Sequence, residues 1–482
     1  MRKSTQKRKP RVLRVGLILL AALILFQLIG GYAPFAKTPA LSQASAAAIE
    51  ERVGEMTRDD PDCADRAAIL ETRPEALDER IRLISQAKSE IIIVSYDCRD
   101  SESVRDILCA ALERADAGVH VRMLLDGLIG LMNVKHSALF KAFNAHENVE
   151  IRFYNPPYFL LPRRHMGRMH DKYVIVDDLG YILGGRNMFD HFLGDYDSPS
   201  GTYSKDREAL IYAGGDAHSS LNQVRRYFEG NWSHEFTVPF NGRPLSEARR
   251  DAVLDDLRAR YRALRAEKPA LFAPADYPAM TLPTDGVWLV NNPTNIDAKE
   301  PVVFNTLCAL METARQDVVI HSPYAVLNDA LRARLCAIAA NVPVTLMINA
   351  VENGANVVAS GDYLFHRGEV LGMGMRVLEY AGGNSYHGKS LAIDDRLSVI
   401  GSFNLDLRST YVDTELMLVI RGEAVNRLLR GHMEALHADC RHAIDEKTAE
   451  VPEGLEIPPL SPGRKAAMWL LGAAMQAFRN LV

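Results

Sequence analysis

Cysteine is scarce in this sequence, and positive charge is not in excess. Only six of the 482 residues are cysteine, and no pair of them has the spacing of zinc ligands, so we expect no structural metal. The formal net charge is −5, whereas non-specific nucleic-acid binding usually shows as a basic surplus. We therefore expect no nucleic-acid partner. The composition, 48% apolar and 24% charged, is that of a globular protein with room for two or three domains.

The few cysteines still leave one alternative open. Cys63 and Cys98 can form a disulfide if the body of the protein lies outside the cytoplasm. Cys109 and Cys336 stand at matching places in the helix-like stretches DILCAAL and ARLCAIA, where small buried core residues are the simpler interpretation.

Charge is absent altogether from residue 15 to residue 36. About 20 apolar residues, at about 1.5 Å each, span a bilayer as a helix. The residues before this run include Arg2, Lys3, Lys7 and Arg8 and no acid, which predicts a cytoplasmic N-terminus and an external body. A signal peptide cleaved near the small residues 44–48 is the alternative. We expect an uncleaved, single-pass anchor in the cell membrane.

The most informative feature that the chain does have is a motif written twice. HDKYVIVDDLGYILGGRN runs from His170 to Asn187, and HGKSLAIDDRLSVIGSFN runs from His387 to Asn404. The two segments align without a gap, with His, Lys, Asp, Gly and Asn at the same offsets. A gapless repeat of this kind predicts two half-sites that face each other across a pseudo-two-fold axis, with one active site at the seam.

Each motif closes a series of alternating strand-like and helix-like segments. The apolar, β-branched run EIIIVSYD at 90–97 is typical of a buried strand, and a segment with helical periodicity follows it as far as Gly118. DVVIHSPY at 317–324 begins the same order again. This alternation predicts an α/β sandwich with a mixed sheet in each half. The boundaries that we expect are a basic tip and membrane helix at 1–36, a tether at 37–64, a first domain at 65–236, a connector at 237–285, a second domain at 286–445 and a tail at 446–482.

The repeated residue types suit a phosphodiester. Side chains two residues apart on a strand share a face, so each histidine projects together with the lysine of its motif. Lysine is a compact positive charge with three donors, asparagine adds neutral donors, and glycine lets the backbone approach closely. Together they predict a cradle for a phosphodiester and its anionic transition state. Its members are His170, Lys172, Gly184, Gly185, Asn187, His387, Lys389, Gly401, Ser402 and Asn404.

Two histidines can divide the chemistry without a metal or a cofactor. One attacks phosphorus, and the other protonates the departing alcohol and later deprotonates the incoming one. Each imidazole then needs a carboxylate on its second ring nitrogen, and Glu208 and Glu415 are the repeat-matched candidates. Asp177 and Asp394 complete the catalytic motif at the strand ends. We expect those two to orient loops or the lysines rather than to touch substrate.

The duplicated HxKxxxxD pattern resembles the phospholipase D superfamily over about residues 65 to 440. RRHMGRMHDKYVIVDD…GGRN and GSFNLDLRSTYVDTEL are most similar to bacterial cardiolipin synthases and close phosphatidyltransferases. The resemblance implies two similar α/β/α domains with the active site between them and a phosphohistidine intermediate. By analogy it implies His170 as nucleophile and His387 as general acid and base. Ser402 matches the family's usual serine, whereas Gly185 departs from it.

Three activities of this superfamily stay open. A phosphatidyl group can pass to a glycerol hydroxyl of a lipid such as phosphatidylglycerol, or to water, and the two reactions share every catalytic residue. A nuclease is disfavoured by the acidic balance and by the anchor. An insertion at 193–205 follows the first motif, and we expect it to shape the acceptor pocket. The expected partners are phospholipids and the bilayer.

The C-terminal segment after Pro462 is apolar but short. Its apolar residues include Met468, Trp469, Leu470 and Phe478, and the run is too often interrupted for a confident second span. We favour an amphipathic helix that lies on the bilayer. A helix packed on the core of the protein is the alternative.

Overall fold

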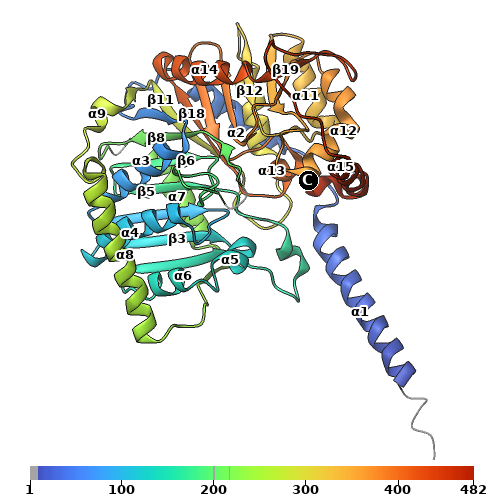
Figure 1. Ribbon diagram of the computed structural model, residues 1–482. Coiled ribbons are helices and arrows are strands. Elements are labelled where there is room, and N and C mark those ends of the chain that lie inside the picture. Colours follow the sequence, from blue (N-terminus) through green and yellow to red (C-terminus); the bar gives the residue numbers. More distant parts are fainter. Residues whose placement is uncertain (1–8, 199–200, 217) are drawn as a thin grey trace, which may run out of the picture.

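The computed structural model describes residues 9–198, 201–216 and 218–482. A body of two sheets and their covering helices carries one long helix, α1 (Lys9–Tyr32), which projects away from it (Figure 1). The segment Arg14–Phe35 is long and apolar enough to cross a membrane, and almost none of it is buried in the protein. The basic residues Arg2, Lys3, Lys7 and Arg8 lie outside the described residues.

The first sheet has the strand order β10-β1-β8-β6-β5-β2-β3-β4-β9. β2, β3 and β4 are parallel to one another, and the other neighbours are antiparallel, so the sheet is mixed. Its strands are β1 (Arg66–Leu70), β2 (Glu90–Ser95), β3 (His120–Asp126), β4 (Val149–Tyr154), β5 (Tyr173–Val176), β6 (Gly180–Gly184), β8 (Glu208–Tyr212), β9 (Thr237–Pro239) and β10 (Leu282–Pro283).

The second sheet repeats this order as β11-β18-β17-β16-β12-β13-β14-β19-β20. Counted from β1 in the first sheet and β11 in the second, β18 corresponds to β8, β17 to β6 and β16 to β5. The first sheet has β10 as an extra strand before β1, and the second has β20 as an extra strand after β19. This correspondence confirms the two similar mixed-sheet halves predicted from the repeat. Its strands are β11 (Gly286–Asn291), β12 (Val318–His321), β13 (Val344–Asn349), β14 (Arg376–Tyr380), β16 (Ser390–Ile393), β17 (Leu397–Gly401), β18 (Leu416–Arg421), β19 (Cys440–Ala443) and β20 (Ala449–Glu450).

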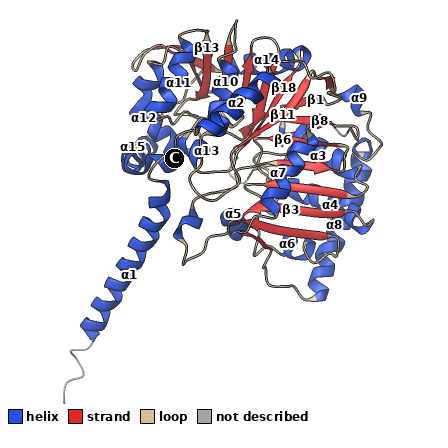
Figure 2. Ribbon diagram, turned by 180° about the vertical axis from the view of Figure 1, so that it is seen from behind, coloured by secondary structure: helices blue, strands red, loops and turns tan. Residues whose placement is uncertain are grey.

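Helices cover the sheets, which run through the middle of the body (Figure 2). Their starts follow ordinary capping chemistry, as in α3, where Thr72 and Glu75 form a reciprocal capping box. The first half has α3 (Arg73–Ser85), α4 (Glu102–Asp116), α5 (Gly127–Asn133), α6 (Ala138–Phe143), α7 (Leu221–Trp232), α8 (Glu247–Glu267) and α9 (Tyr277–Met280). The second has α10 (Val302–Met311), α11 (Asp329–Ala339), α12 (Val357–Leu371), α13 (Leu407–Tyr411), α14 (Glu423–His437) and α15 (Pro462–Met475).

One apolar core joins the two halves. Ile175 and Ile211 of the first sheet lie in the same buried cluster as Ala392, Ile400 and Leu418 of the second. The motif strands of both halves contribute to this cluster, so burial of apolar surface holds the two copies of the motif against each other. The active-site seam therefore follows from the hydrophobic pattern of the strands that carry the motifs.

Two segments differ from the organisation expected from the sequence. Residues 37–64 were expected to be a tether, yet they contain α2 (Gln43–Met56), whose residues Ile49, Val53 and Met56 are buried in the core of the second half. Residues 237–285 were expected to be a connector, yet α8 packs on α4, with Arg260 paired to Asp106 at 2.6 Å. A sparse apolar stripe on a polar helix is a weak signal in sequence, which explains both differences.

The C-terminal helix has one packed and one open face. Met468 and Gly472 of α15 are buried on α12, where a Cβ on Gly361 would lie 2.5 Å from the Met468 carbonyl oxygen. Trp469 and Leu470 point outward and are exposed. The first face matches the alternative of a helix packed on the core of the protein, and a position on the bilayer stays a prediction for the exposed face. All six cysteines lie in the described part and are free, so Cys63 and Cys98 do not form the bond considered above.

Candidate active site

The first histidine is held by a carboxylate of the other half. Nδ1 of His170 lies 2.8 Å from Oε1 of Glu415, and the His170 backbone N–H donates to the Thr414 carbonyl at 3.2 Å. Glu415 also accepts from the hydroxyls of Ser402 and Ser409. The Glu415 carboxyl group is thereby held by three contacts, and its contact with Nδ1 leaves Nε2 as the free ring nitrogen of His170.

The second histidine repeats this geometry with the halves exchanged. Nδ1 of His387 lies 2.7 Å from Oδ2 of Asp206, and its backbone N–H donates to the Lys205 carbonyl at 2.7 Å. The short strands β7 (Ser204–Lys205) and β15 (Ser385–Tyr386) pair in parallel and bring these residues together. In both cases the carboxylate belongs to the residue that follows the accepting carbonyl. The pseudo-two-fold axis therefore relates two histidine–carboxylate pairs, each assembled from both halves.

Glu208 does not orient a histidine, and this expectation is corrected. Its carboxylate is buried between Arg80, at 2.6 and 2.7 Å, and Arg186, at 3.4 Å. The reason is strand register: Gly184 pairs with Glu208, and its counterpart Gly401 pairs with Met417. Asp206 is thus the true counterpart of Glu415. The two acidic pairs in the sequence are therefore offset from each other by two residues. Because side chains two residues apart on a strand lie on the same face, the alternation of the sequence does not reveal this offset.

The departure of Gly185 from serine has a steric explanation. A Cβ on Gly185 would lie 2.4 Å from Oδ1 of Asp206, so the carboxylate occupies the space of a side chain. In the second half the longer Glu415 leaves room for Ser402, whose hydroxyl donates to it. In both halves the residue after the motif glycine and the histidine-binding carboxylate fill the same space, as Gly185 with Asp206 and as Ser402 with Glu415.

Gly185→Ala should therefore disturb the site rather than merely fill space. The added methyl group must displace the Asp206 carboxylate from His387, and overpacking of this kind costs about 1–3 kcal/mol of stability. We expect a lowered free energy of unfolding. We also expect turnover to fall at least tenfold, which corresponds to a rise of about 1.4 kcal/mol in the activation barrier. Urea unfolding and initial rates measure the two effects. Gly230→Ala in α7, where nothing lies within 4 Å of a Cβ, is the matched control and should leave both unchanged or slightly raise stability. Equal behaviour of the two variants would contradict the steric account.

The two motif lysines are buried and lie beside the histidines. Nζ of Lys389 lies 2.9 and 3.1 Å from the ring nitrogens of His387, and Lys172 donates to the His170 carbonyl oxygen. Burial lowers the pKa of Lys172 to about 8, partly offset by Glu415, and lowers the pKa of Lys389 to about 7, partly offset by Asp206. Each lysine also lowers the other half's histidine pKa, which shows that the two motifs share one electrostatic environment.

The carboxylates carry different charge, and the histidines are uncharged. Burial lowers the pKa of His387 to about 3 and that of His170 well below its ordinary value. Burial raises the pKa of Glu415 to about 8. The pKa of Asp206 lies below its ordinary value because His387, Lys389 and Arg186 outweigh the effect of burial. His387 is therefore backed by an anion, whereas the partner of His170 is largely neutral at pH 7.

The motif asparagines form part of the same walls. Asn187 accepts a hydrogen bond from the Asp97 backbone N–H at 3.4 Å, and Asn404 donates to Ser409 at 3.3 Å. Among the described residues, Oδ1 of Asn404 is a buried atom without a hydrogen-bond partner. Buried amide oxygens are seldom left in this state, so the atom is a candidate contact for a substrate hydroxyl.

The motif aspartates lie away from the histidines. Asp177, at φ +47°, accepts from the backbone N–H groups of Lys88, Ser89 and Glu90 at the start of β2. Asp394, also at φ +47°, does the same for residues 315–317 before β12. The expectation that they orient loops matches these contacts, and the alternative that they orient the lysines does not. Their place in the catalytic set is corrected to a bracing role.

The remaining motif glycines also act within the sheet. A Cβ on Gly184 would lie 2.5 Å from Cγ of Glu208, and one on Gly401 would lie 2.2 Å from the Leu416 carbonyl oxygen. These glycines let β8 and β18 approach, so the close contact that the sequence predicts is with a neighbouring strand.

Two aromatic residues of the site were missed by the sequence analysis. The Tyr96 ring lies 5.0 Å from the His170 ring and 5.1 Å from Nζ of Lys172, and the Phe192 ring lies 5.1 Å from the His387 ring. Tyr96 follows the end of β2, next to the parallel strand β3, and that position was the available signal. Among the described residues, no group of three or more His, Cys, Asp or Glu side chains is arranged to hold a metal ion.

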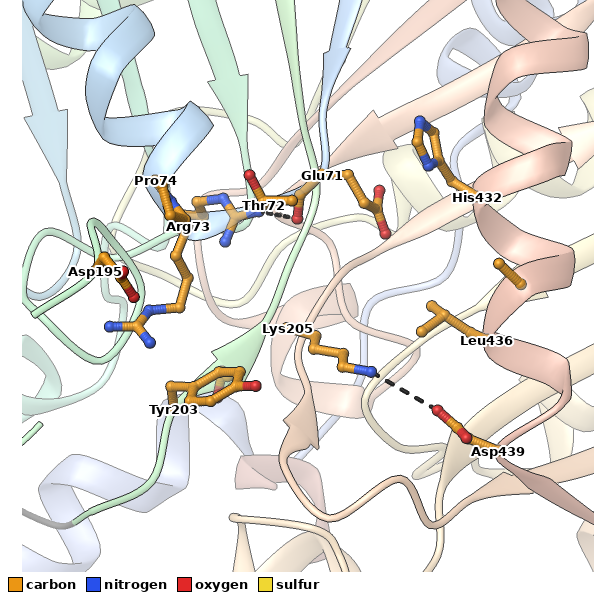
Figure 3. A pocket seen from close by; sticks show the side chains of 13 residues that line it. Glu71, Thr72, Arg73, Pro74, Asp195, Tyr203, Lys205, His432, Leu436 and Asp439 are labelled. Carbon is orange, nitrogen blue, oxygen red and sulfur yellow. Dashed lines mark hydrogen bonds and ion pairs between the residues drawn. The ribbon is translucent and has the colours of Figure 1, made fainter. Parts of the chain in front are cut away.

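A pocket of about 450 Å³ lies between the halves beside this site (Figure 3). Asp195, Tyr203 and Lys205 from the insertion line it, opposite His432 and Asp439 near the end of α14. Lys205 points across the pocket toward Asp439, 3.8 Å away, while its carbonyl oxygen accepts from His387. The pocket is therefore connected to the second histidine by one backbone hydrogen bond, and residues 199–200 of the insertion lie outside the described part.

A comparison with known families agrees with this duplicated architecture. The sequence pattern of the family described as "Cardiolipin synthase, PLD-like domain" matches residues 81–232 and 307–437, more than half of the chain and once in each half. The chain belongs to the phospholipase D superfamily. Each match covers the central strands of one sheet and contains one copy of the histidine motif.

Relatives of known sequence extend the comparison. An uncharacterized protein of Helicobacter pylori strain 26695 is 26% identical over 388 residues, 72% of this phospholipase D-like chain and 74% of the relative. Cardiolipin synthase C of Escherichia coli strain K12 is 26% identical over 408 residues, 75% of this chain and 82% of the relative. The similarity thus spans both halves.

A solved structure supports the fold. Phosphatidylserine synthase of Haemophilus influenzae Rd KW20 superposes with a TM-score of 0.63 at 15% identity, covering 90% of this chain and 99% of the other. At this identity the likeness concerns the fold, and it agrees with two phospholipase D-like halves joined face to face.

Proposed function

We propose that this protein is a membrane-anchored phosphatidyltransferase of the cardiolipin synthase type. The observation that carries the proposal is the reciprocal pair of histidine–carboxylate contacts, His170 with Glu415 and His387 with Asp206. Two oriented imidazoles beside two lysines suit a reaction in which one ring attacks phosphorus and the other transfers a proton. The names of the relatives add phospholipid as the substrate class.

In the first step Nε2 of His170 forms a bond to phosphorus, and the bond from phosphorus to the departing alcohol oxygen breaks. That oxygen takes a proton from Nε2 of His387. In the second step His387 takes the proton of an incoming hydroxyl, whose oxygen bonds to phosphorus as the bond to His170 breaks. The difference between the carboxylates supports this division of roles, because the anionic Asp206 stabilises the imidazolium form of His387.

The lysines are proposed to hold the non-bridging phosphate oxygens. A bound phosphodiester is anionic throughout the physiological range, so it offsets the mutual repulsion of Lys172 and Lys389 and stabilises their charged forms. The same anion favours protonation of His387. The site is therefore expected to gain its working protonation state only when substrate is bound.

The pH profile should show this coupling. The pKa of Lys389 is about 7 and that of Lys172 about 8 in the free protein, both lowered from their ordinary values. Protonated lysine is the binding form, so kcat/KM should fall as pH rises above about 7, by about tenfold per pH unit for one group. Because bound substrate raises the lysine pKa values, kcat should hold to a higher pH. Initial rates between pH 6 and 9 test this, and a kcat/KM that stays flat to pH 9 would refute the role of the lysines.

The anchor and its orientation are part of the proposal. α1 supplies a helix of membrane-spanning length, and the basic residues before it favour a cytoplasmic N-terminus with both catalytic halves on the extracytoplasmic side. Phospholipids, with phosphatidylglycerol as the first candidate, and the bilayer are the proposed partners. The insertion at 193–205 is proposed to shape the pocket for the acceptor alcohol.

Mass spectrometry of lipids after incubation with phosphatidylglycerol vesicles tests the activity. Cardiolipin as product supports transfer, and phosphatidic acid without cardiolipin replaces transfer by hydrolysis. Neither product would refute both lipid reactions for this donor. The nucleophile is identified by acid quench and peptide mapping of the phosphorylated intermediate. Label on the His170 peptide is expected, and label on His387 alone would reverse the two roles.

A further inference from the structure

The C-terminal end of α1 lies between two segments that expose large apolar side chains. One is the loop Tyr158–Leu161, in which Phe159 is 54% and Leu160 is 63% exposed. The other is α15 with the short helix η4 (Gln476–Leu481), in which Trp469 is 59% and Leu470 is 61% exposed. Both adjoin the apolar surface of α1 itself.

The loop is attached to α1 through a polar side chain of that helix. Nε2 of Gln27 donates to the Phe159 carbonyl oxygen at 2.8 Å, and Oε1 of Gln27 lies 3.0 Å from Nε2 of His165. A Cβ on Gly30 would lie 2.9 Å from Cγ of Pro162, so the helix packs closely on the ring of the residue that follows the loop. The loop also closes on itself, with Leu161 donating to the Tyr158 carbonyl oxygen at 2.9 Å.

This contact sets the depth of the loop relative to the helix. Gln27 precedes the last residue of α1, Tyr32, by five residues, or about 7.5 Å at 1.5 Å per residue. The segment able to cross a membrane continues to Phe35. If α1 spans a bilayer, Phe159 and its neighbours lie below the surface of that bilayer. A glutamine amide inside hydrocarbon requires partners, and Phe159 of the loop and His165 after it provide them.

The second segment reaches the same end of α1 from the C-terminus (Figure 1). The rings of Tyr32 and Phe478 are 5.1 Å apart, and Nδ2 of Asn480 donates to the Ala36 carbonyl oxygen at 3.0 Å. Trp469 contacts Phe365 of α12 at 6.4 Å between ring centroids, which extends this apolar surface onto α12.

We propose that the loop Tyr158–Leu161 and the exposed face of α15 with Phe478 enter the acyl layer of the membrane that α1 spans, one on each side of α1. The inference rests on the proposed membrane anchor. The bilayer is the occupant because both surfaces are continuous with the lipid-facing surface of α1, and because the loop shares its depth. Aromatic and aliphatic side chains at such a boundary contribute buried apolar area without a protein partner.

The arrangement ties the catalytic chemistry to the lipid surface. The loop ends nine residues before His170 in the same connection from β4 to β5. Arg163 and Arg164 follow it after Pro162, and basic side chains beside a bilayer attract anionic headgroups. Three contacts with the bilayer, rather than one flexible stalk, would fix the position of the site relative to the phosphodiester layer.

Spin labels on cysteine variants of the full-length protein in phosphatidylglycerol-containing nanodiscs test the inference. The background replaces the partly exposed Cys63 and Cys336 by serine. Labels at Leu28→Cys on α1, Leu160→Cys and Trp469→Cys should collide with dissolved oxygen far more than with an aqueous nickel complex. The matched control is Leu428→Cys, which is 38% exposed. It belongs to α14, a helix at the end of the body away from α1 (Figures 1 and 2). It should show the opposite preference.

The outcomes separate the docking surface from the anchor. A water-like label at Leu160 or Trp469 beside a lipid-like label at Leu28 overturns the inference and leaves the anchor intact. A water-like label at Leu28 refutes the anchor itself. Protection of Leu160 from both reagents means that protein, such as a second copy of this chain, covers the loop, and this also overturns the inference.

A functional readout completes the test. Leu160→Asp places a charge in the proposed acyl layer and should lower turnover on vesicles at least about tenfold, while turnover on a short-chain, monomeric phospholipid is unchanged. Leu428→Asp should affect neither. Equal loss on both substrates would show that the loop supports the site and not the membrane contact, and no loss on vesicles would overturn the inference as well.

Discussion

Replacing His170 by alanine should reduce turnover by about 10⁴-fold or more while the fold stays intact, because loss of a covalent nucleophile removes both steps of the reaction. The stability cost should be small. Glu415 keeps the hydroxyl donors Ser402 and Ser409, and its raised pKa of about 8 lets the carboxyl group persist in neutral form. Turnover on lipid and the thermal unfolding midpoint are the two measurements.

His387→Ala should give a comparable loss, since one group serves both as acid and as base. Asp206 would retain its hydrogen bond from the Arg207 backbone N–H and the nearby charges of Lys389 and Arg186, so unfolding should again occur near the wild-type temperature. Turnover within about tenfold of the wild type in either variant would contradict the two-histidine mechanism.

The second large effect separates two neighbouring acidic residues. Asp206→Asn should lower kcat by about 10³-fold or more at nearly unchanged stability. The amide keeps the volume but removes the anion that stabilises the His387 imidazolium and favours its useful tautomer. Glu208→Gln should act in the opposite manner. It leaves the buried guanidinium groups of Arg80 and Arg186 without their counter-charge, which costs about 3–5 kcal/mol of stability.

Urea unfolding and steady-state rates on the folded fraction distinguish the two variants. Glu229→Gln is a suitable control, because its ion pair with Arg122 is partly exposed and such pairs contribute about 0–1 kcal/mol. A catalytic loss in Glu208→Gln, with wild-type rates in Asp206→Asn, would restore the assignment suggested by the sequence repeat.

The duplicated fold and most of the site could be predicted because the repeat has strong internal redundancy. Two gapless copies fix the positions of His170 and His387. The two-residue spacing correctly predicted that each lysine lies beside its histidine, although both pairs precede the strands β5 and β16 rather than lying on them. Which carboxylate meets which histidine depends on contacts between halves. Such contacts follow from the docking of two sheets, which local periodicity does not encode.

The error at Glu208 illustrates that limit in detail. Asp206, two positions before Glu208, projects from the same face of the chain. Only the strand pairing of Gly184 with Glu208 shows which of the two acidic residues corresponds to Glu415. The role of Tyr96 and the burial of helix α2 were not predicted for a related reason, since each depends on contact with a distant part of the chain. The loop-orienting role of Asp177 and Asp394 was predicted from their place at strand ends, and each accepts backbone hydrogen bonds at the start of another strand of its own half.

The crossed placement of the two carboxylates has a genetic consequence. Each half holds a complete motif, yet the carboxylate that contacts its histidine belongs to the opposite half. A gene fragment for either half alone would therefore encode a histidine without its carboxylate partner. Damage to one half cannot be compensated by the sound copy in the same polypeptide. Both copies of the motif therefore have to be kept in one polypeptide for either histidine to have its carboxylate partner.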